Sequence, residues 1–127
     1  MNEPVFLSRE AVDLIHAASL RAFGGVDGVR DENALESALA QPMHERFYRQ
    51  ADLFQIAAAY AYHIAENQPY LDGNKRTGLL SALNFLAENG IVSDQPVSEF
   101  YDAMIAIAEK RLDKAGLAAL FRARLDS

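Results

Sequence analysis

The sequence predicts an all-α protein with about six helices. Apolar residues recur every three to four positions along nearly the whole chain, and no alternating apolar run of strand length occurs. Glycine, proline, asparagine and aspartate divide the chain into segments of helical length. Because 127 residues suit one ordinary domain, we expect a single compact helical bundle over residues 1–127.

Two helices are expected in the first third of the chain. Ser8, a good N-cap, precedes the first periodic stretch, which stops at a glycine-rich loop over residues 24–30. Asp31 is a candidate cap for a short second helix, which we expect to end before Pro42 because the residue before a proline disfavours the helical conformation. Residues 43–51 show no clear period and are expected to form a loop or an irregular turn.

Two long apolar helices are expected at the centre of the bundle, over residues 52–66 and 73–89. The apolar stripe of the first helix is wide, which indicates a helix covered on several sides. The connection, residues 67–72, is short, so the two helices are expected to pack antiparallel. Amphipathic helices at about 98–110 and 114–125, the second capped by Asp113, complete the chain.

Composition excludes several classes of protein. The chain has no cysteine, which excludes disulfides, a thiolate zinc site and a cysteine nucleophile. Eighteen Asp and Glu residues against twelve Lys and Arg give a net charge of −6, which argues against direct DNA binding. No signal peptide and no membrane-spanning segment are evident. We therefore expect a cytoplasmic protein.

One segment, residues 67–77 (NQPYLDGNKRT), carries unusual chemistry. Gly73 permits a left-handed conformation at the start of a helix, where unpaired amides and the helix dipole favour anions. Lys75 and Arg76 add two positive charges, and arginine binds phosphate oxygens in pairs. Asp72 is a hard oxygen ligand of the kind that binds Mg²⁺ beside phosphates. This combination indicates phosphoryl or nucleotidyl transfer.

The same segment also fits a purely structural interpretation. In that case Asp72 or Asn74 caps the following helix, and Lys75 and Arg76 are solvated surface residues. The spaced Gly-Lys-Ser/Thr pattern of P-loop nucleotide-hydrolysing enzymes is absent.

The segment resembles the signature of the Fic/Doc (Fido) superfamily, roughly His-Pro-Phe-x-Asp-Gly-Asn-Lys/Gly-Arg. Lysine before arginine is similar to the Doc branch, the death-on-curing toxins, and Leu79 stands where Fic AMP transferases have a second arginine. The resemblance extends over about residues 5–92. It implies a Fic/Doc-like domain over residues 1–127, with the motif loop between two central antiparallel helices. Further similar positions are Leu7 and residues 15–16, 23–25, 28–31, 35–39, 57–62 and 85–90.

The resemblance also implies roles for individual residues. Gln68 stands at the position of the catalytic histidine, the general base of the family, and Tyr70 replaces the usual phenylalanine. The catalytic positions are then Gln68, Asp72, Lys75 and Arg76, the nucleotide phosphates bind Gly73, Asn74, Lys75 and Arg76, and the metal ligand is Asp72.

We therefore expect a Doc-like toxin that transfers phosphate from ATP, with Mg²⁺, to a hydroxyl of a translation factor resembling elongation factor Tu. Its expected partner is an antitoxin of the Phd type, because the family's inhibitory motif Ser/Thr-x-x-x-Glu-Gly/Asn is absent. Gln68 cannot accept a proton, so the chain is expected to be inactive as written, either as a pseudoenzyme or through a disarming substitution. The alternatives are a degenerate Fic-domain binding module and a Fic-type AMP transferase.

The three histidines are dispersed in the sequence and predict no metal site. His16 is expected in the core or at the boundary of the first helix, and His63 is expected to be a packed or partly exposed structural side chain. His44, with Tyr48 and Arg49 nearby, lies in a segment that the resemblance relates to a flap which aligns a target strand. The alternative for that segment is a solvated loop.

Overall fold

The computed structural model describes residues 3–94 and 96–125 and contains six α-helices over that part of the chain. The only β-structure there is one isolated antiparallel bridge between Val29 and Tyr70. This confirms the all-α prediction, and no helix of the described residues is long and apolar enough to cross a membrane. The helices are α1 (Arg9–Phe23), α2 (Glu32–Arg49), α3 (Leu53–Asn67), α4 (Asn74–Glu88), α5 (Val97–Ala108) and α6 (Lys114–Leu125).

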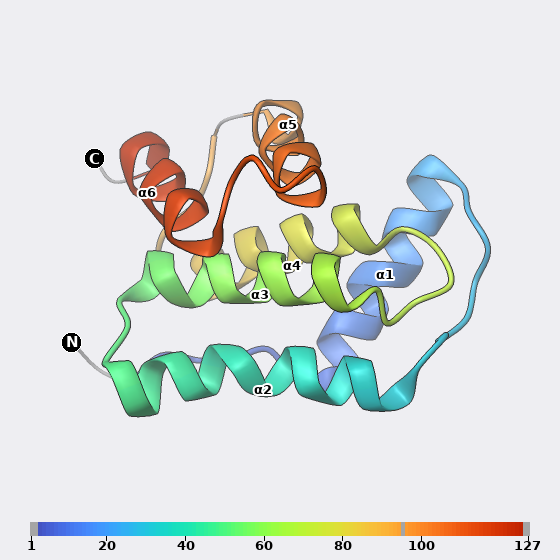
Figure 1. Cartoon of the computed structure of the whole chain (residues 1–127), viewed down its shortest axis with the longest axis horizontal. Helices are drawn as coiled ribbons and strands as arrows, with labels where there is room; N and C mark the ends of the chain where they lie inside the picture. The colour runs from blue at the N-terminus through green and yellow to red at the C-terminus, as the bar shows by residue number, and fades with distance from the viewer. Residues whose placement is uncertain (1–2, 95, 126–127) are drawn as a thin grey trace.

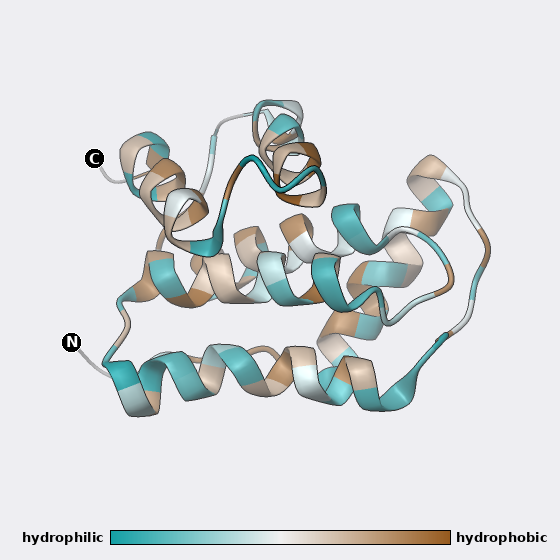
Figure 2. Cartoon of the chain, viewed as in Figure 1, coloured by the Kyte–Doolittle hydropathy of each residue, from teal (hydrophilic) through white to brown (hydrophobic). Residues whose placement is uncertain are grey.

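Helix α3 is the centre of the bundle. Figure 1 shows α2 on one side of α3, α5 and α6 on the other, and α4 alongside, and α3 contacts all four. Its wide apolar stripe is buried, and Figure 2 shows the contrast with the more hydrophilic α2. The central pair, α3 and α4, runs antiparallel with the motif loop between them, as predicted.

The predicted caps are confirmed. Ser8 Oγ accepts a hydrogen bond from the Ala11 amide at 3.0 Å, and Asp31 Oδ1 accepts one from the Ala34 amide at 3.0 Å. Such caps satisfy amides that the first turn of a helix leaves unpaired. The starts of α1 and α2 therefore follow directly from the sequence.

The prediction for α2 was wrong. The helix does not stop before Pro42 but continues through it to Arg49, so part of the expected loop is helical. Proline removes one backbone hydrogen bond, and tertiary contacts further along offset that loss. Phe47 packs its ring 6.2 Å from Phe6, and Glu45 forms an ion pair with Lys114 of α6.

We predict that Gly78→Ala destabilises the fold, because a Cβ atom there would lie 2.7 Å from the backbone oxygen of Ala61 on α3. Neither backbone can move without opening the central helix pair, so the free energy of unfolding should fall by about 1–3 kcal/mol. Urea denaturation followed by circular dichroism measures this change.

The matched control is Gly116→Ala on α6, where the new Cβ atom meets mainly the end of the flexible Leu112 side chain. That variant should change stability by less than about 1 kcal/mol, because alanine also favours the helix. A Gly78→Ala variant as stable as this control would show that the α3–α4 contact is looser than described.

Candidate functional site

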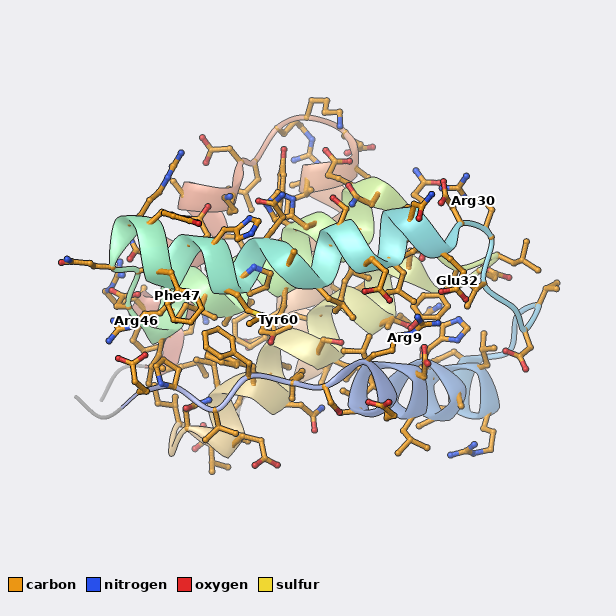
Figure 3. All side chains as sticks on the ribbon, turned by 90° about the horizontal axis from the view of Figure 1, so that it is seen from below. Arg9, Arg30, Glu32, Arg46, Phe47 and Tyr60 are labelled. Atoms are coloured by element: carbon orange, nitrogen blue, oxygen red, sulfur yellow. The ribbon has the colours of Figure 1, made fainter. Side chains whose placement is uncertain are left out.

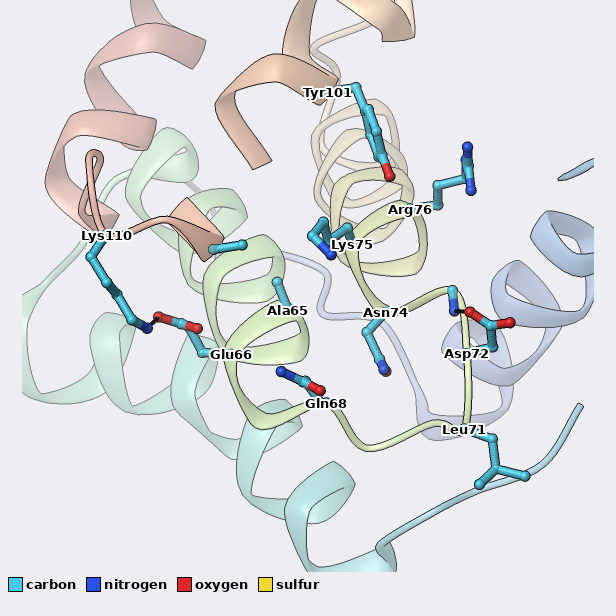
Figure 4. Close-up of a pocket in the computed structure, with 12 residues that line it drawn as sticks. Ala65, Glu66, Gln68, Leu71, Asp72, Asn74, Lys75, Arg76, Tyr101 and Lys110 are labelled. Atoms are coloured by element: carbon cyan, nitrogen blue, oxygen red, sulfur yellow. Dashed lines mark hydrogen bonds and ion pairs between the residues drawn. The ribbon is translucent and has the colours of Figure 1, made fainter. Parts of the chain in front are cut away.

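The motif loop and the start of α4 open onto a cavity of about 510 Å³. Helix α3, helix α5 and the turn after α5 form its other walls (Figure 4). The structure brings all six predicted site residues together at this cavity. Some of them offer polar groups that are free to bind a ligand, whereas others have their polar groups occupied by hydrogen bonds within the protein. The lining residues are Ala65, Glu66, Gln68, Leu71, Asp72, Gly73, Asn74, Lys75, Arg76, Tyr101, Ala108 and Lys110.

The loop that follows α1 fixes the first half of the motif. The guanidinium of Arg30 donates to the carbonyl oxygens of Gln68 at 2.7 Å and Asn67 at 2.9 Å. The Leu71 amide donates to the Gly28 carbonyl oxygen at 2.9 Å. A cation at the end of α3 satisfies carbonyls that have no partner within the helix, so Arg30 stabilises this helix end. Gln68 itself ends α3 in the left-handed conformation, with φ 48°.

Helix α1 packs against the motif loop and holds it in place. The His16 ring stacks on the Tyr70 ring with centroids 3.7 Å apart, and His16 Nε2 lies 2.9 Å from the Asp72 carbonyl oxygen. The Tyr70 hydroxyl donates to Asp13 Oδ1 at 2.7 Å. Burial and this hydrogen bond raise the pKa of Tyr70, so the hydroxyl remains a donor. Figure 3 shows Arg9, which pairs with Asp13 and with Glu32 and so ties this support to α2.

His16 is buried, as predicted, but its bond to the motif loop was not foreseen. The two partners are 56 residues apart, and no local pattern in the sequence connects them. His16 and Asp13 are therefore residues of the site that only the structure identifies.

The start of α4 presents free hydrogen-bond donors. The amides of Asn74, Lys75 and Arg76 have no partner within the described part of the chain, whereas the Gly73 amide donates to Asp72 Oδ1 at 2.9 Å. The Asn74 side chain is also occupied, because it bonds both the amide and the carbonyl of Tyr70 at 3.0 Å. The free backbone amides and the charged side chains of Lys75 and Arg76 are thus the groups available to an anion.

Asp72 is the carboxylate of the motif that is available to a metal ion. It is exposed, and each of its oxygens accepts one backbone hydrogen bond, from Gly73 at 2.9 Å and from Val26 at 3.3 Å. Among the described residues, no group of three or more potential ligands gathers. This donor set fits Mg²⁺ only in the way Mg²⁺ commonly binds beside phosphates, through one carboxylate completed by phosphate oxygens and water.

The far wall of the cavity carries an ion pair that the sequence did not reveal. Glu66 of α3 pairs with Lys110, which follows α5 in the left-handed conformation with φ 62°. Figure 4 shows this pair across the cavity from Arg76. With Lys75 and Asp72, the walls hold three cations and two carboxylates, so the cavity is locally more basic than the acidic chain around it.

The other two histidines lie outside the cavity. His63 Nε2 lies 3.1 Å from Lys114 Nζ on α6, which makes it a structural side chain, as predicted. His44 stacks edge-on against Tyr48, with ring centroids 5.7 Å apart, on the exposed face of α2. The residues expected in a flap or loop are therefore helical.

Comparisons with known proteins place this chain among relatives of similar length. The model of a family described as the Fic/DOC family matches residues 6–86. The chain is 31% identical over 118 residues to "Protein kinase doc" of Escherichia phage P1, an alignment that covers 91% of this chain and 92% of the relative. It is 36% identical over 118 residues to "Toxin Doc" of Mycolicibacterium smegmatis, covering 90% of this chain and 88% of the relative.

We predict that Arg76→Ala weakens the binding of Mg·ATP. The guanidinium offers charge-assisted hydrogen bonds to phosphate oxygens, and its loss should cost about 1.5–3 kcal/mol of binding free energy. Isothermal titration calorimetry of both proteins measures the difference. Arg49→Ala, an exposed arginine of α2 that does not line this cavity, is the matched control. Equal affinities of the Arg76 variant and the wild type would contradict an anion site here.

A second prediction concerns pH and His63. Burial, followed by the nearby charge of Lys114, lowers the pKa of His63 from 6.5 to about 4, although Glu45 and Glu66 act in the opposite direction. Between these two values the unfolded chain binds the proton and the folded chain does not, so stability is lost as the pH falls.

The free energy of unfolding should therefore decrease by about 1–2 kcal/mol between pH 7 and pH 4.5, beyond the decrease found for a His63→Gln variant. Urea denaturation across this range provides the comparison. Identical pH profiles for the two proteins would show that His63 is freely protonated in the folded state.

Proposed function

The chain belongs to the Fic/DOC family, and we propose from this membership that it is a Doc-like toxin built to transfer the γ-phosphate of ATP to a hydroxyl of a translation factor resembling elongation factor Tu. The observation that carries the proposal is the convergence of Asp72, Lys75, Arg76 and the free amides of α4 at one cavity. The relatives named as a protein kinase and as a toxin support it. A cytoplasmic location follows from the proposed target.

The charged groups of the motif and the free amides of α4 have separate roles in the proposed reaction. Lys75, Arg76 and the amides at the start of α4 would bind the phosphates and stabilise the charge that develops during transfer. Asp72 would hold Mg²⁺, which neutralises phosphate charge when bound. A bond forms between the target oxygen and the γ-phosphorus, the bond to the ADP oxygen breaks, and the target hydroxyl must lose its proton to a base.

Gln68 supplies no such base. It lines the cavity at the family's catalytic-histidine position, but its amide does not accept a proton near neutral pH. The chain as written is therefore proposed to bind ATP and to transfer phosphate very slowly, since a positioned base contributes about 10²–10⁴ in rate.

Kinase activity is proposed ahead of AMP transfer on one further observation. Leu79, at the position of the second arginine of Fic AMP transferases, is completely buried. A buried leucine offers no cation to a nucleotide. The site therefore lacks the second arginine of the Fic form, which supports the Doc form.

The proposed partner is an antitoxin of the Phd type. A second, largely apolar cavity of about 370 Å³, called here the apolar groove, adjoins the first and shares Arg76 and Tyr101 with it. Exposed Phe23 and Val97 border it, so an amphipathic segment of an antitoxin would cover apolar surface there. The same groove supports the alternative that this chain is a binding module, because it does not depend on Gln68.

We predict that Gln68→His raises phosphate transfer by about two to four orders of magnitude, because a histidine with a pKa near 6.5 accepts the hydroxyl proton. Purified elongation factor Tu is incubated with ATP carrying the label at the γ or at the α position. Label transferred only from the γ position supports the kinase, and α label supports the AMP transferase. The variant is also expected to be toxic when expressed without an antitoxin.

The control for this experiment is the double variant Gln68→His with Arg76→Ala, which keeps the base and loses the main phosphate ligand. It should return transfer to the low level of the starting chain. If Gln68→His transfers neither label and harms no cells, the binding module becomes the better account.

A further inference from the structure

Arg76 is held between two aromatic rings that belong to other helices. Its guanidinium carbon lies 4.4 Å from the ring centroid of Phe23, at the end of α1, and 5.1 Å from that of Tyr101 in α5. Figure 4 shows Tyr101 beside Arg76 at the upper edge of the cavity. No hydrogen bond or ion pair engages the Arg76 side chain within the described residues. The two ring contacts are thus the interactions that restrain it.

This arrangement leaves the N–H donors of the Arg76 guanidinium free. A guanidinium can stack on aromatic faces, and its N–H donors then point outward in its own plane. The rings therefore restrict the rotamers of Arg76 without occupying its donors. A long side chain restrained in this way loses less conformational entropy when a ligand binds.

The two rings differ in how far the core accounts for them, because Tyr101 also packs against the hydrophobic core. Phe23 is 60% exposed, so packing in the core does not account for it. Tyr101 is partly buried. Tyr101 and Arg76 each line both the site cavity and the apolar groove. Arg76 and Tyr101 thus lie between the two cavities, and Phe23 lines the apolar one.

We infer that Phe23 and Tyr101 are positioning residues for Arg76, which hold its guanidinium ready for the phosphates of the nucleotide. The inference rests on the proposed function, because it takes ATP to be the ligand of the cavity. Neither residue belongs to the motif, and Tyr101 lies beyond the region matched by the family model. Affinity for the nucleotide at α4 thus depends on side chains from α1 and α5.

Calorimetric titration with Mg·ATP tests the inference on four single variants. Phe23→Leu and Tyr101→Leu, which remove one ring each, should weaken binding about 3- to 10-fold, the cost of immobilising one long side chain. Tyr101→Phe keeps the ring and should bind like the wild type. Tyr48→Leu removes an exposed ring on α2 and should also have no effect.

A double-mutant cycle separates positioning from a general structural effect. In an Arg76→Ala background the Tyr101→Leu substitution should produce no further loss, because there is no guanidinium left to position. An equal loss in both backgrounds would overturn the inference, as would unchanged binding by both ring variants. If the wild-type chain itself binds no ATP, the proposed function fails and this inference fails with it. That result is distinct from the two above, in which the wild-type chain binds ATP and only the inference fails.

A spectroscopic measurement gives a readout that needs no nucleotide. In NMR spectra of the free protein, ring currents should shift the Arg76 side-chain protons upfield, and each ring-removing variant should reduce that shift. Unshifted Arg76 protons in the wild type would show that the guanidinium is not held between the rings and would overturn the inference.

Discussion

The site depends on the close approach of α3 and α4. Gly78 lies against the Ala61 carbonyl so tightly that a single methyl group would meet the backbone oxygen at 2.7 Å. These two antiparallel helices are joined by residues 68–73, so the chain reverses within a few residues. Gln68 and Gly73 achieve the reversal in left-handed conformations, with φ 48° and 77°. The position of the motif loop is therefore a consequence of helix packing.

Neighbouring elements then fix the loop, and each uses a polar contact. His16 bonds the Asp72 carbonyl from α1, Arg30 bonds two carbonyls at the end of α3, and Asn74 closes the loop on Tyr70. Because the loop's own polar groups are satisfied in this way, the amides of α4 and the charges of Lys75 and Arg76 are left for a ligand. Free donors and two cations thus gather at one cavity in a chain whose net charge is −6.

Local signals in the sequence predicted most of the fold, and tertiary contacts explain what they missed. Periodicity and caps such as Ser8 and Asp31 gave the helices, because both act within one turn. Pro42 misled the prediction because contacts of Glu45 and Phe47 with distant elements sustain the helix beyond it. The motif located the cavity, but its far wall, with Lys110, comes from a turn that carries no recognisable pattern.

In the proposed reaction, phosphate binding and proton transfer belong to different elements. The donors proposed for phosphate come from the first turn of α4, whereas position 68 is the residue that ends α3. The backbone at position 68 is held by Arg30 through the carbonyl oxygen, an atom that every residue type supplies. A change of side chain there would alter the proposed proton acceptor and leave the loop backbone, the cations and the apolar groove in place. Glutamine at this position is therefore compatible with a folded protein that keeps these surfaces while lacking the base that the proposed transfer requires.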